Sequence, residues 1–315
     1  MNSYNDDPRP PQEMKVSAES QNVSSEVPPE GGGTPGEGTG QGYSITNAAG
    51  TLVYPPPEKA YPEDLQISWS WPHFLVFGVF VICLLVSVPA ALLGIYGPHR
   101  AMTKDQLEQF MISRPEISIG GTLLIYGLVL FFLYVSLAML RGMPFWSTVG
   151  WRKIRPVAGG ISVHPLVFAL TGAGLSIFVL GVTNFIQRPE KLPIDEVFKH
   201  RQTAVMFVAM AMLVAPLVEE TVFRGYLYPM FARWFGVGPS VVLTGVLFGL
   251  MHGPQLGDAK SLIAIMSFVG VVFTLVRART GSVFASYLMH LGYNSLIGVS
   301  LLLATHGFTQ MPPAQ

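Results

Sequence analysis

Three charged side chains stand beside an apolar run in the second half of the chain. The segment "LVEETVFRGYLYPMF", residues 217–231, carries Glu219, Glu220 and Arg224. On an α-helix, Glu220 and Arg224 are four residues apart on one face and can form an ion pair. Glu219 is rotated by about 100° from Glu220 and has no partner nearby in the sequence. A carboxylate desolvated in this way can serve as a general base.

A simpler interpretation of this segment is that all three charges lie at the membrane interface, at the end of a helix. Pro216, just upstream, removes a helix hydrogen bond and predicts a bend at this point.

Two other apolar segments contain polar groups that a lipid environment would disfavour. "FGLMHG" ends an apolar run at His252, and Phe248 lies four residues earlier on the same face, where it can shield the imidazole from lipid. "MHLGYN" places His290 and Asn294 four residues apart on one face of a long apolar segment. Simpler interpretations are a capping histidine before Gly-Pro, and an interhelical hydrogen bond that fixes packing.

Taken together, one glutamate, two histidines and one asparagine from three helices can activate water, hold a divalent metal or stabilise an oxyanion. His252 and His290 are 38 positions apart, which excludes a zinc motif on a single helix. Any metal would therefore be held between helices, and a metal-free, glutamate-dependent hydrolase is equally compatible with these residues. The single cysteine, Cys83, excludes an intrachain disulfide and a thiolate metal site.

The elements that must position these groups are membrane helices. Only 12% of the residues are charged, and the mean hydropathy is +0.44. A membrane span needs roughly 20 apolar residues. The apolar runs predict helices near 72–96, 118–140, 164–186, 203–218, 238–252, 261–277 and 282–304. We therefore expect an all-α, polytopic membrane bundle of seven or eight spans, in which Gly245 and Gly249 allow a close approach between helices.

The N-terminal region differs in composition. Residues 1–64 contain three basic and ten acidic residues, a net charge of −7, whereas the remainder carries +7. Richness in Pro, Gly, Ser and Glu predicts disorder. The expected divisions are a disordered tail (1–65), N-terminal transmembrane helices and loops (66–200), a catalytic helical core (201–306) and a short C-terminal tail (307–315).

The start of the chain lacks the features of a signal peptide, so the first membrane helix is expected to direct insertion. Residues 141–156 carry four basic residues and no acidic one, and residues 277–280 add two more. The positive-inside rule places both loops, and with them the N-terminal tail, in the cytoplasm, although the opposite loops are also basic. The expected location is a membrane, the cell membrane if the protein is bacterial.

The three motifs resemble a known family. "EETVFRG", "FGLMH" and "HLGYN" are similar to the EExxxR, FxxxH and HxxxN motifs of the CPBP family, which contains CAAX prenyl proteases and bacteriocin-processing or Abi proteins. The resemblance extends over about Ala204 to Leu303. It implies an α-helical intramembrane endopeptidase, or metalloprotease, that acts on a protein or peptide substrate in a cavity inside the bundle.

Carried over by position, the resemblance implies a role for each motif residue. Glu219 would activate water and His252 would help to orient it, while His290 and Asn294 would bind a metal or stabilise the oxyanion. Glu220, Arg224 and Phe248 would support the site. Zn²⁺ or another divalent metal, held by Glu219, His252, His290 and Asn294, is one form of this mechanism, and a metal-free form is the other.

Two other functions stay open from the sequence. A non-catalytic membrane immunity or scaffold protein would use the same polar groups for packing. A proton-coupled transporter would use them as a relay and would show inverted repeats, but no repeat is visible. The lipid bilayer is the expected surrounding, no nucleic acid is expected as a partner, and nothing in the sequence indicates an oligomeric state.

Overall fold

The structure, a computed structural model, describes residues 62–98, 113–156, 160–186 and 192–309, with 45–46, 52–53, 102–103, 106–107, 110 and 189. The chain divides into two units, Met1–Glu58 and Lys59–Gln315. In the first unit, strands β1 (Ile45–Thr46) and β2 (Leu52–Val53) pair antiparallel, with Ile45 opposite Val53. The remainder of that unit, where the tail was predicted, lies outside the described residues, and so do residues 310–315.

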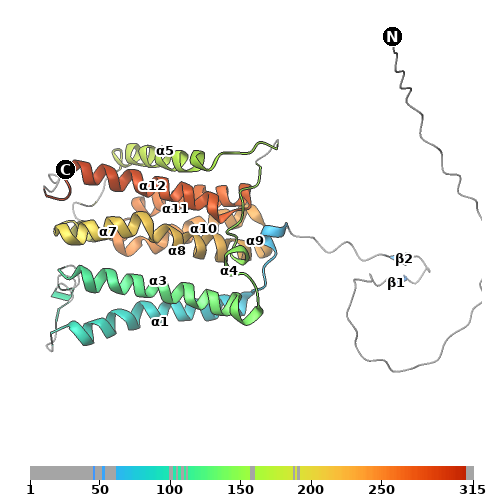
Figure 1. The fold of residues 1–315 in the computed structure, drawn as a ribbon, viewed down its shortest axis with the longest axis horizontal. Helices are drawn as coiled ribbons and strands as arrows, with labels where there is room; N and C mark the ends of the chain where they lie inside the picture. Colours follow the sequence, from blue (N-terminus) through green and yellow to red (C-terminus); the bar gives the residue numbers. More distant parts are fainter. Residues whose placement is uncertain are drawn as a thin grey trace, which may run out of the picture. The chain divides into compact units, whose positions relative to one another are not determined.

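The second unit is helical throughout most of its described length (Figure 1). Its elements are η1 (Glu63–Leu65), α1 (Trp71–Tyr96), α3 (Pro115–Leu137), η2 (Met139–Arg141), α4 (Phe145–Thr148), α5 (Pro165–Thr183), α6 (Pro193–Val197), α7 (Arg201–Leu213), α8 (Ala215–Glu220), η3 (Thr221–Leu227), α9 (Tyr228–Phe235), α10 (Val237–Met251), η4 (Gly253–Leu256), α11 (Lys260–Thr280) and α12 (Val283–Ala304). η3 is a π-helix, and η1, η2 and η4 are short 3₁₀ turns.

Within the described residues, six helical stretches are long and apolar enough to cross a membrane. They are Trp71–Tyr96, Glu116–Arg141, Pro165–Thr183, Arg201–Phe235, Lys260–Thr280 and Val283–Ala304. The remaining predicted segment, 238–252, forms the shorter apolar helix α10. Its 15 residues extend roughly 22 Å, which is less than the thickness of the hydrocarbon layer. All seven predicted segments are therefore helical, and the prediction of an all-α membrane bundle is confirmed.

The outer helices present apolar side chains to their surroundings. On α1, Leu75, Val79, Ile82 and Val86 share one face and are between 62% and 67% exposed. An apolar surface of this extent would be unfavourable in water but suits contact with lipid.

The helical stretch that contains the paired carboxylates is longer than predicted. α7, α8, η3 and α9 follow one another from Arg201 to Phe235, with a break at Val214 just before Pro216, where a bend was predicted. The charged residues made the span appear to end at 218, but Glu220 and Arg224 are fully buried in protein. The interpretation as interfacial charges at a helix end is therefore wrong.

Small residues allow close contact between neighbouring helices, as predicted for Gly245 and Gly249. A Cβ atom at either position of α10 would collide with the backbone of α11. Gly172 of α5 and Gly292 of α12 likewise face the backbone of the partner helix, and Figure 1 shows α5 lying along α12. Backbone contact of this kind holds helices together in lipid, where the hydrophobic effect between them is absent.

The chain enters the bundle through an ion-paired strap, residues 63–69. Asp64 accepts hydrogen bonds from Arg277 Nη1 at 3.1 Å and from Arg155 Nη1 at 2.8 Å, and the side chain of Arg277 is only 1% exposed. Residues 63–65 were predicted as part of the tail because of its Pro-, Gly-, Ser- and Glu-rich composition. They are folded onto the bundle because a buried arginine needs a counter-charge.

The strap is also anchored by an aromatic contact. Trp69 stacks on Tyr226 of η3, with ring centroids 5.5 Å apart, and its indole N–H donates to the Tyr226 carbonyl at 3.2 Å. Leu65 packs with Tyr228, Ala232 and Val241. The strap therefore rests against the same π-helix that carries Arg224.

Gly245→Ala is expected to lower the stability of the bundle. Its Cβ atom would meet the backbone of Val271, which cannot rotate away, so α10 and α11 must separate at a cost of about 2 kcal/mol. The midpoint of thermal unfolding in detergent measures this. Gly238→Ala is the matched control on α10, because nothing lies within 4 Å of its Cβ position. Equal midpoints for the two variants would contradict the close contact.

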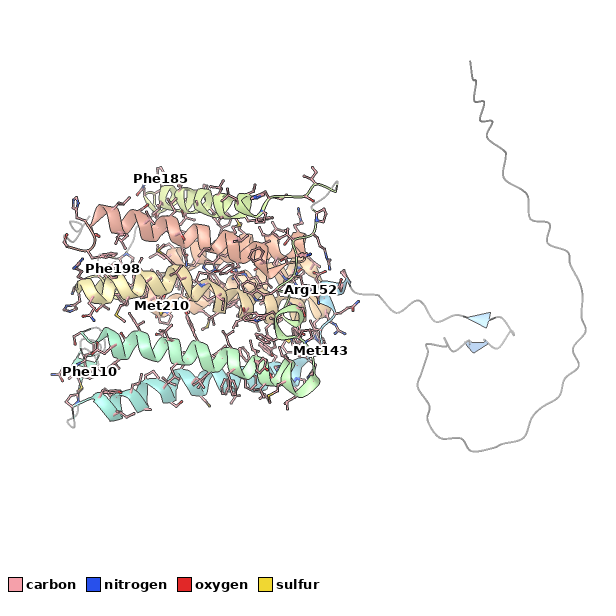
Figure 2. The ribbon with its side chains drawn as sticks, viewed as in Figure 1. Phe110, Met143, Arg152, Phe185, Phe198 and Met210 are labelled. Atoms are coloured by element: carbon pink, nitrogen blue, oxygen red, sulfur yellow. The ribbon has the colours of Figure 1, made fainter. Side chains whose placement is uncertain are left out.

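Asp64→Asn is expected to destabilise the protein by about 3 kcal/mol, because it leaves the buried Arg277 without its counter-charge. The neighbouring Glu63 pairs with Arg152 but is 72% exposed, so Glu63→Gln should change stability by no more than about 0.5 kcal/mol. Unfolding midpoints of both variants at neutral pH test the difference. Figure 2 labels Arg152 at this end of the bundle.

The same contact predicts a dependence on pH. Burial alone would raise the pKa of Asp64, but Arg277 and Arg155 outweigh it and hold the pKa below its ordinary value of 3.8. The stabilisation is therefore fully present above that value and is lost as the pH falls through the lowered pKa of the folded protein. The difference between the parent and Asp64→Asn should accordingly be constant from pH 5 to 7 and shrink below about pH 4.

Candidate active site

A small cavity of about 90 Å³ lies inside the bundle and is lined by side chains from seven of its elements and from His252, which directly follows α10. The lining consists of Tyr126, Phe207, Met210, Ala211, Ala215, Glu219, Phe248, His252, Gln255, Met266, Val269, Phe273, His290, Tyr293 and Asn294. Figure 2 labels Met210 on α7. The four residues predicted as catalytic, Glu219, His252, His290 and Asn294, all line this cavity. Its volume is enough for several water molecules.

Arg224 is held by a set of polar and aromatic contacts. Its Nη1 donates to Glu220 Oε1 at 2.9 Å, its Nη2 to the Gly270 carbonyl at 2.9 Å, and its Nε to Thr274 Oγ1 at 3.2 Å. The guanidinium carbon lies 4.5 Å from the centroid of the Phe248 ring. The predicted Glu220–Arg224 pair is thus present, and the other two hydrogen bonds of Arg224 connect η3 to α11.

Glu220 also contacts His290, which the sequence did not indicate. His290 Nδ1 lies 3.0 Å from Glu220 Oε1. A carboxylate paired with arginine can only accept hydrogen bonds, so Nδ1 carries the proton and donates it. This fixes the imidazole orientation and leaves Nε2 towards the cavity. The ring also packs against Phe273, with centroids 4.7 Å apart.

Glu219 points away from Glu220 and into the cavity, as the helical phase predicts. Its Oε2 lies 3.8 Å from His290 Nε2, and its Oε1 lies 3.4 Å from the hydroxyl of Tyr126. The side chain is 18% exposed, whereas Glu220 is fully buried. The two adjacent carboxylates therefore differ in position: Glu220 holds Arg224 and His290, and Glu219 faces the space where a water molecule can bind.

His252 ends α10, directly before the 3₁₀ turn η4. Its Nδ1 lies 2.8 Å from the Phe248 carbonyl and must donate to it, which leaves Nε2 free of that contact. The centroid of its imidazole ring lies 4.6 Å from the centroid of the Phe248 ring. His252 thus both ends the helix and lines the cavity. The two interpretations drawn from the sequence, a helix cap and a site residue, are therefore compatible.

Asn294 makes an interhelical hydrogen bond from α12 to α7. Its amide nitrogen donates to the Ala211 carbonyl at 2.8 Å. The packing role considered from the sequence is therefore real, yet the side chain also lines the cavity, and a second amide hydrogen is available.

The predicted metal ligands have suitable chemistry but are not grouped as a metal site. In both histidines an acceptor holds Nδ1, the arrangement that orients Nε2 for a metal. However, within the part of the chain that the structure describes, no three His, Cys, Asp or Glu side chains form a group that could hold a metal ion.

Tyr126 is a cavity residue that the sequence analysis missed. It lies on α3, far from the motifs, and it has no charge that would draw notice in an apolar helix. The only signal available was a hydroxyl group in the middle of a predicted span.

These observations define a polytopic membrane protein in which carboxylate, imidazole and amide side chains line an internal cavity. Residues 201–296 match the family described as type II CAAX prenyl endopeptidase Rce1-like, in agreement with the resemblance of the three motifs to CAAX proteases. The match begins with α7 and ends within α12, and it includes every motif residue. Together with the six apolar helices, it identifies an integral membrane protein.

The chain is also similar to an uncharacterized 24.3 kDa protein of Escherichia coli. The two are 26% identical over 217 residues, which cover 62% of this chain and 96% of the relative. No solved structure matches significantly.

Proposed function

We propose that the protein is an intramembrane endopeptidase that hydrolyses a peptide bond in a membrane-associated or C-terminal protein segment. The observation that carries this proposal is the placement of Glu219 in the cavity, opposite a histidine whose far nitrogen is fixed by a buried carboxylate–arginine pair. The match to a family of CAAX prenyl endopeptidases supports the same reaction.

The gap between Glu219 and His290 suits a water molecule. At 3.8 Å, the two side chains are too far apart for a direct hydrogen bond, and polar groups at this separation are commonly bridged by water. The carboxylate and the neutral Nε2 are both acceptors, so each can take one hydrogen of the same water. The lone pairs of the water oxygen are then free to point at a substrate carbonyl.

In the proposed reaction Glu219 takes a proton as the water oxygen bonds to the carbonyl carbon of the substrate. The resulting oxyanion can accept the available amide hydrogen of Asn294. When the tetrahedral intermediate collapses, the C–N bond breaks and Glu219 returns the proton to the leaving amine. Glu220 and Arg224 do not contact the reacting atoms in this scheme but hold His290 in place.

A divalent metal held by Glu219, His252, His290 and Asn294 is the other form of the proposal. Such a metal would supply a Lewis acid and a more acidic bound water. The two imidazole Nε2 atoms, the carboxylate and the amide oxygen are its candidate ligands. The reaction above needs none of these groups to act as a ligand, which makes the two forms separable by experiment.

Glu219→Gln is expected to lower the rate of peptide cleavage by about 10³-fold, because the amide cannot accept the proton. Its unfolding midpoint should stay close to that of the parent, since Glu219 has no salt bridge with an arginine or lysine in the described part of the chain. Cleavage of internally quenched peptides, with prenylated and unprenylated C-termini, by the protein in nanodiscs measures the rate.

Glu220→Gln is the matched comparison, because it should lower both activity and stability by removing the counter-charge of Arg224. If Glu219→Gln cleaves as fast as the parent, the assigned base is wrong. If the parent cuts no peptide while both substitutions only change stability, the protein is a non-catalytic membrane component that uses the polar groups for packing.

Activity is expected to survive 1,10-phenanthroline and EDTA, because the water is activated by Glu219 and His290 in the metal-free form. Metal content of the purified protein, measured by mass spectrometry, accompanies the assay. One zinc per chain, with activity lost on chelation and restored by added zinc, would overturn the metal-free form. His252→Ala should then also lower the zinc content, a readout that does not depend on activity.

A further inference from the structure

Tyr126 brings a hydroxyl group from α3 to the catalytic cavity. The oxygen of that hydroxyl lies 3.4 Å from Glu219 Oε1, and the side chain forms part of the cavity lining. An ionised carboxylate has no hydrogen to give, so Tyr126 must be the donor. The contact joins α3 to α8, between residues 93 positions apart.

The two oxygens of Glu219 therefore have different surroundings. Oε1 faces Tyr126, and Oε2 faces the gap beside His290 where the water is proposed to bind. A glutamate side chain has three rotatable bonds, and with one oxygen held, fewer orientations of the other are available. A tyrosine has only two such bonds before its hydroxyl, so it is a comparatively rigid anchor.

We propose that Tyr126 is a positioning residue for peptide hydrolysis, and that its hydroxyl holds Oε1 of Glu219 so that Oε2 faces the water. This inference rests on the proposed role of Glu219 as the base. It adds a residue from outside the segment 201–296 that matches the protease family, and it makes the N-terminal helices part of the site.

The packing of α3 explains how the hydroxyl is kept at this depth. Val129, Leu133 and Leu137, on the C-terminal half of α3, are buried in one core cluster with Phe223 and Leu227 of η3. The helix that carries Tyr126 is thus fixed against the helical stretch that carries Glu219. A shift of α3 along the bundle would move the hydroxyl away from the carboxylate.

The simpler role for Tyr126 is filling of space, and the test must separate it from positioning. Tyr126→Phe keeps the ring and removes only the hydroxyl. The matched control is Tyr134→Phe, eight positions further along α3, because Tyr134 is 45% exposed and does not line the catalytic cavity. Both are assayed as full-length protein in nanodiscs with the internally quenched peptide that the parent cleaves best.

Tyr126→Phe should lower kcat about 10-fold, since one hydrogen bond to a charged group is lost and its length places it at the weak end of the range. KM should stay within about twofold, because the hydroxyl acts on the base and not on substrate binding. Tyr134→Phe should match the parent in both constants. The unfolding midpoints of both variants should stay close to that of the parent.

A double-substitution cycle then asks whether Tyr126 acts through Glu219. Glu219→Asp shortens the side chain and withdraws the carboxylate from the hydroxyl, so adding Tyr126→Phe to it should cause no further loss in long incubations. An equal, additive loss in both backgrounds would overturn the inference, as would a Tyr126→Phe variant with parental kcat.

If Glu219→Gln is inactive while Tyr126→Phe is fully active, only the positioning role is wrong. If Glu219→Gln is fully active, the assigned base is wrong and the positioning role falls with it. A fall in the unfolding midpoint of Tyr126→Phe, with kcat and KM both changed, would assign the tyrosine to packing alone.

Discussion

The hydrogen-bonded charge pair between Arg224 and Glu220 is the contact on which the rest of the site depends. Two full charges lie inside a bundle of membrane helices, where neither can be solvated by water, and each would be strongly unfavourable alone. Their partners come from four elements: α8 and η3 supply the pair, α11 supplies a carbonyl and a hydroxyl, and α12 supplies His290. Satisfying these charges therefore also sets the relative positions of the helices that surround the cavity.

Contacts within one helix were predictable from helical phase, whereas the individual contacts between helices were not. Helical phase alone predicted that Glu220 would pair with Arg224 and that Glu219 would point elsewhere, because both follow from the rotation between adjacent residues. The contact of Glu220 with His290 could not be predicted, since it depends on how α12 packs against α8. The match to the protease family covers all three motifs. For this reason the motifs could be assigned to one site from the sequence.

Two boundaries expected from the sequence differ from the structure because buried charges were not anticipated. The fourth span was ended at 218 because acidic residues follow, and Glu63 and Asp64 were assigned to the tail because of its Pro-, Gly-, Ser- and Glu-rich composition. In the structure, Glu220 and Asp64 are matched by the buried guanidinium groups of Arg224 and Arg277. Tyr126 was missed for the opposite reason, because an uncharged residue in an apolar helix gives no signal until its neighbours are known.

The small volume of the cavity limits the conformation of any segment that the proposed reaction would cut there. A space of about 90 Å³ accommodates water and a short piece of main chain, whereas an intact α-helix is about 10–12 Å across. A substrate segment that arrives as a helix would have to unwind before its carbonyl could reach Glu219. Breaking helical hydrogen bonds in lipid is unfavourable, so chain ends and segments with glycine or proline would reach the base most readily. Selection among substrates would then depend on how easily a segment unwinds as much as on which side chains it carries.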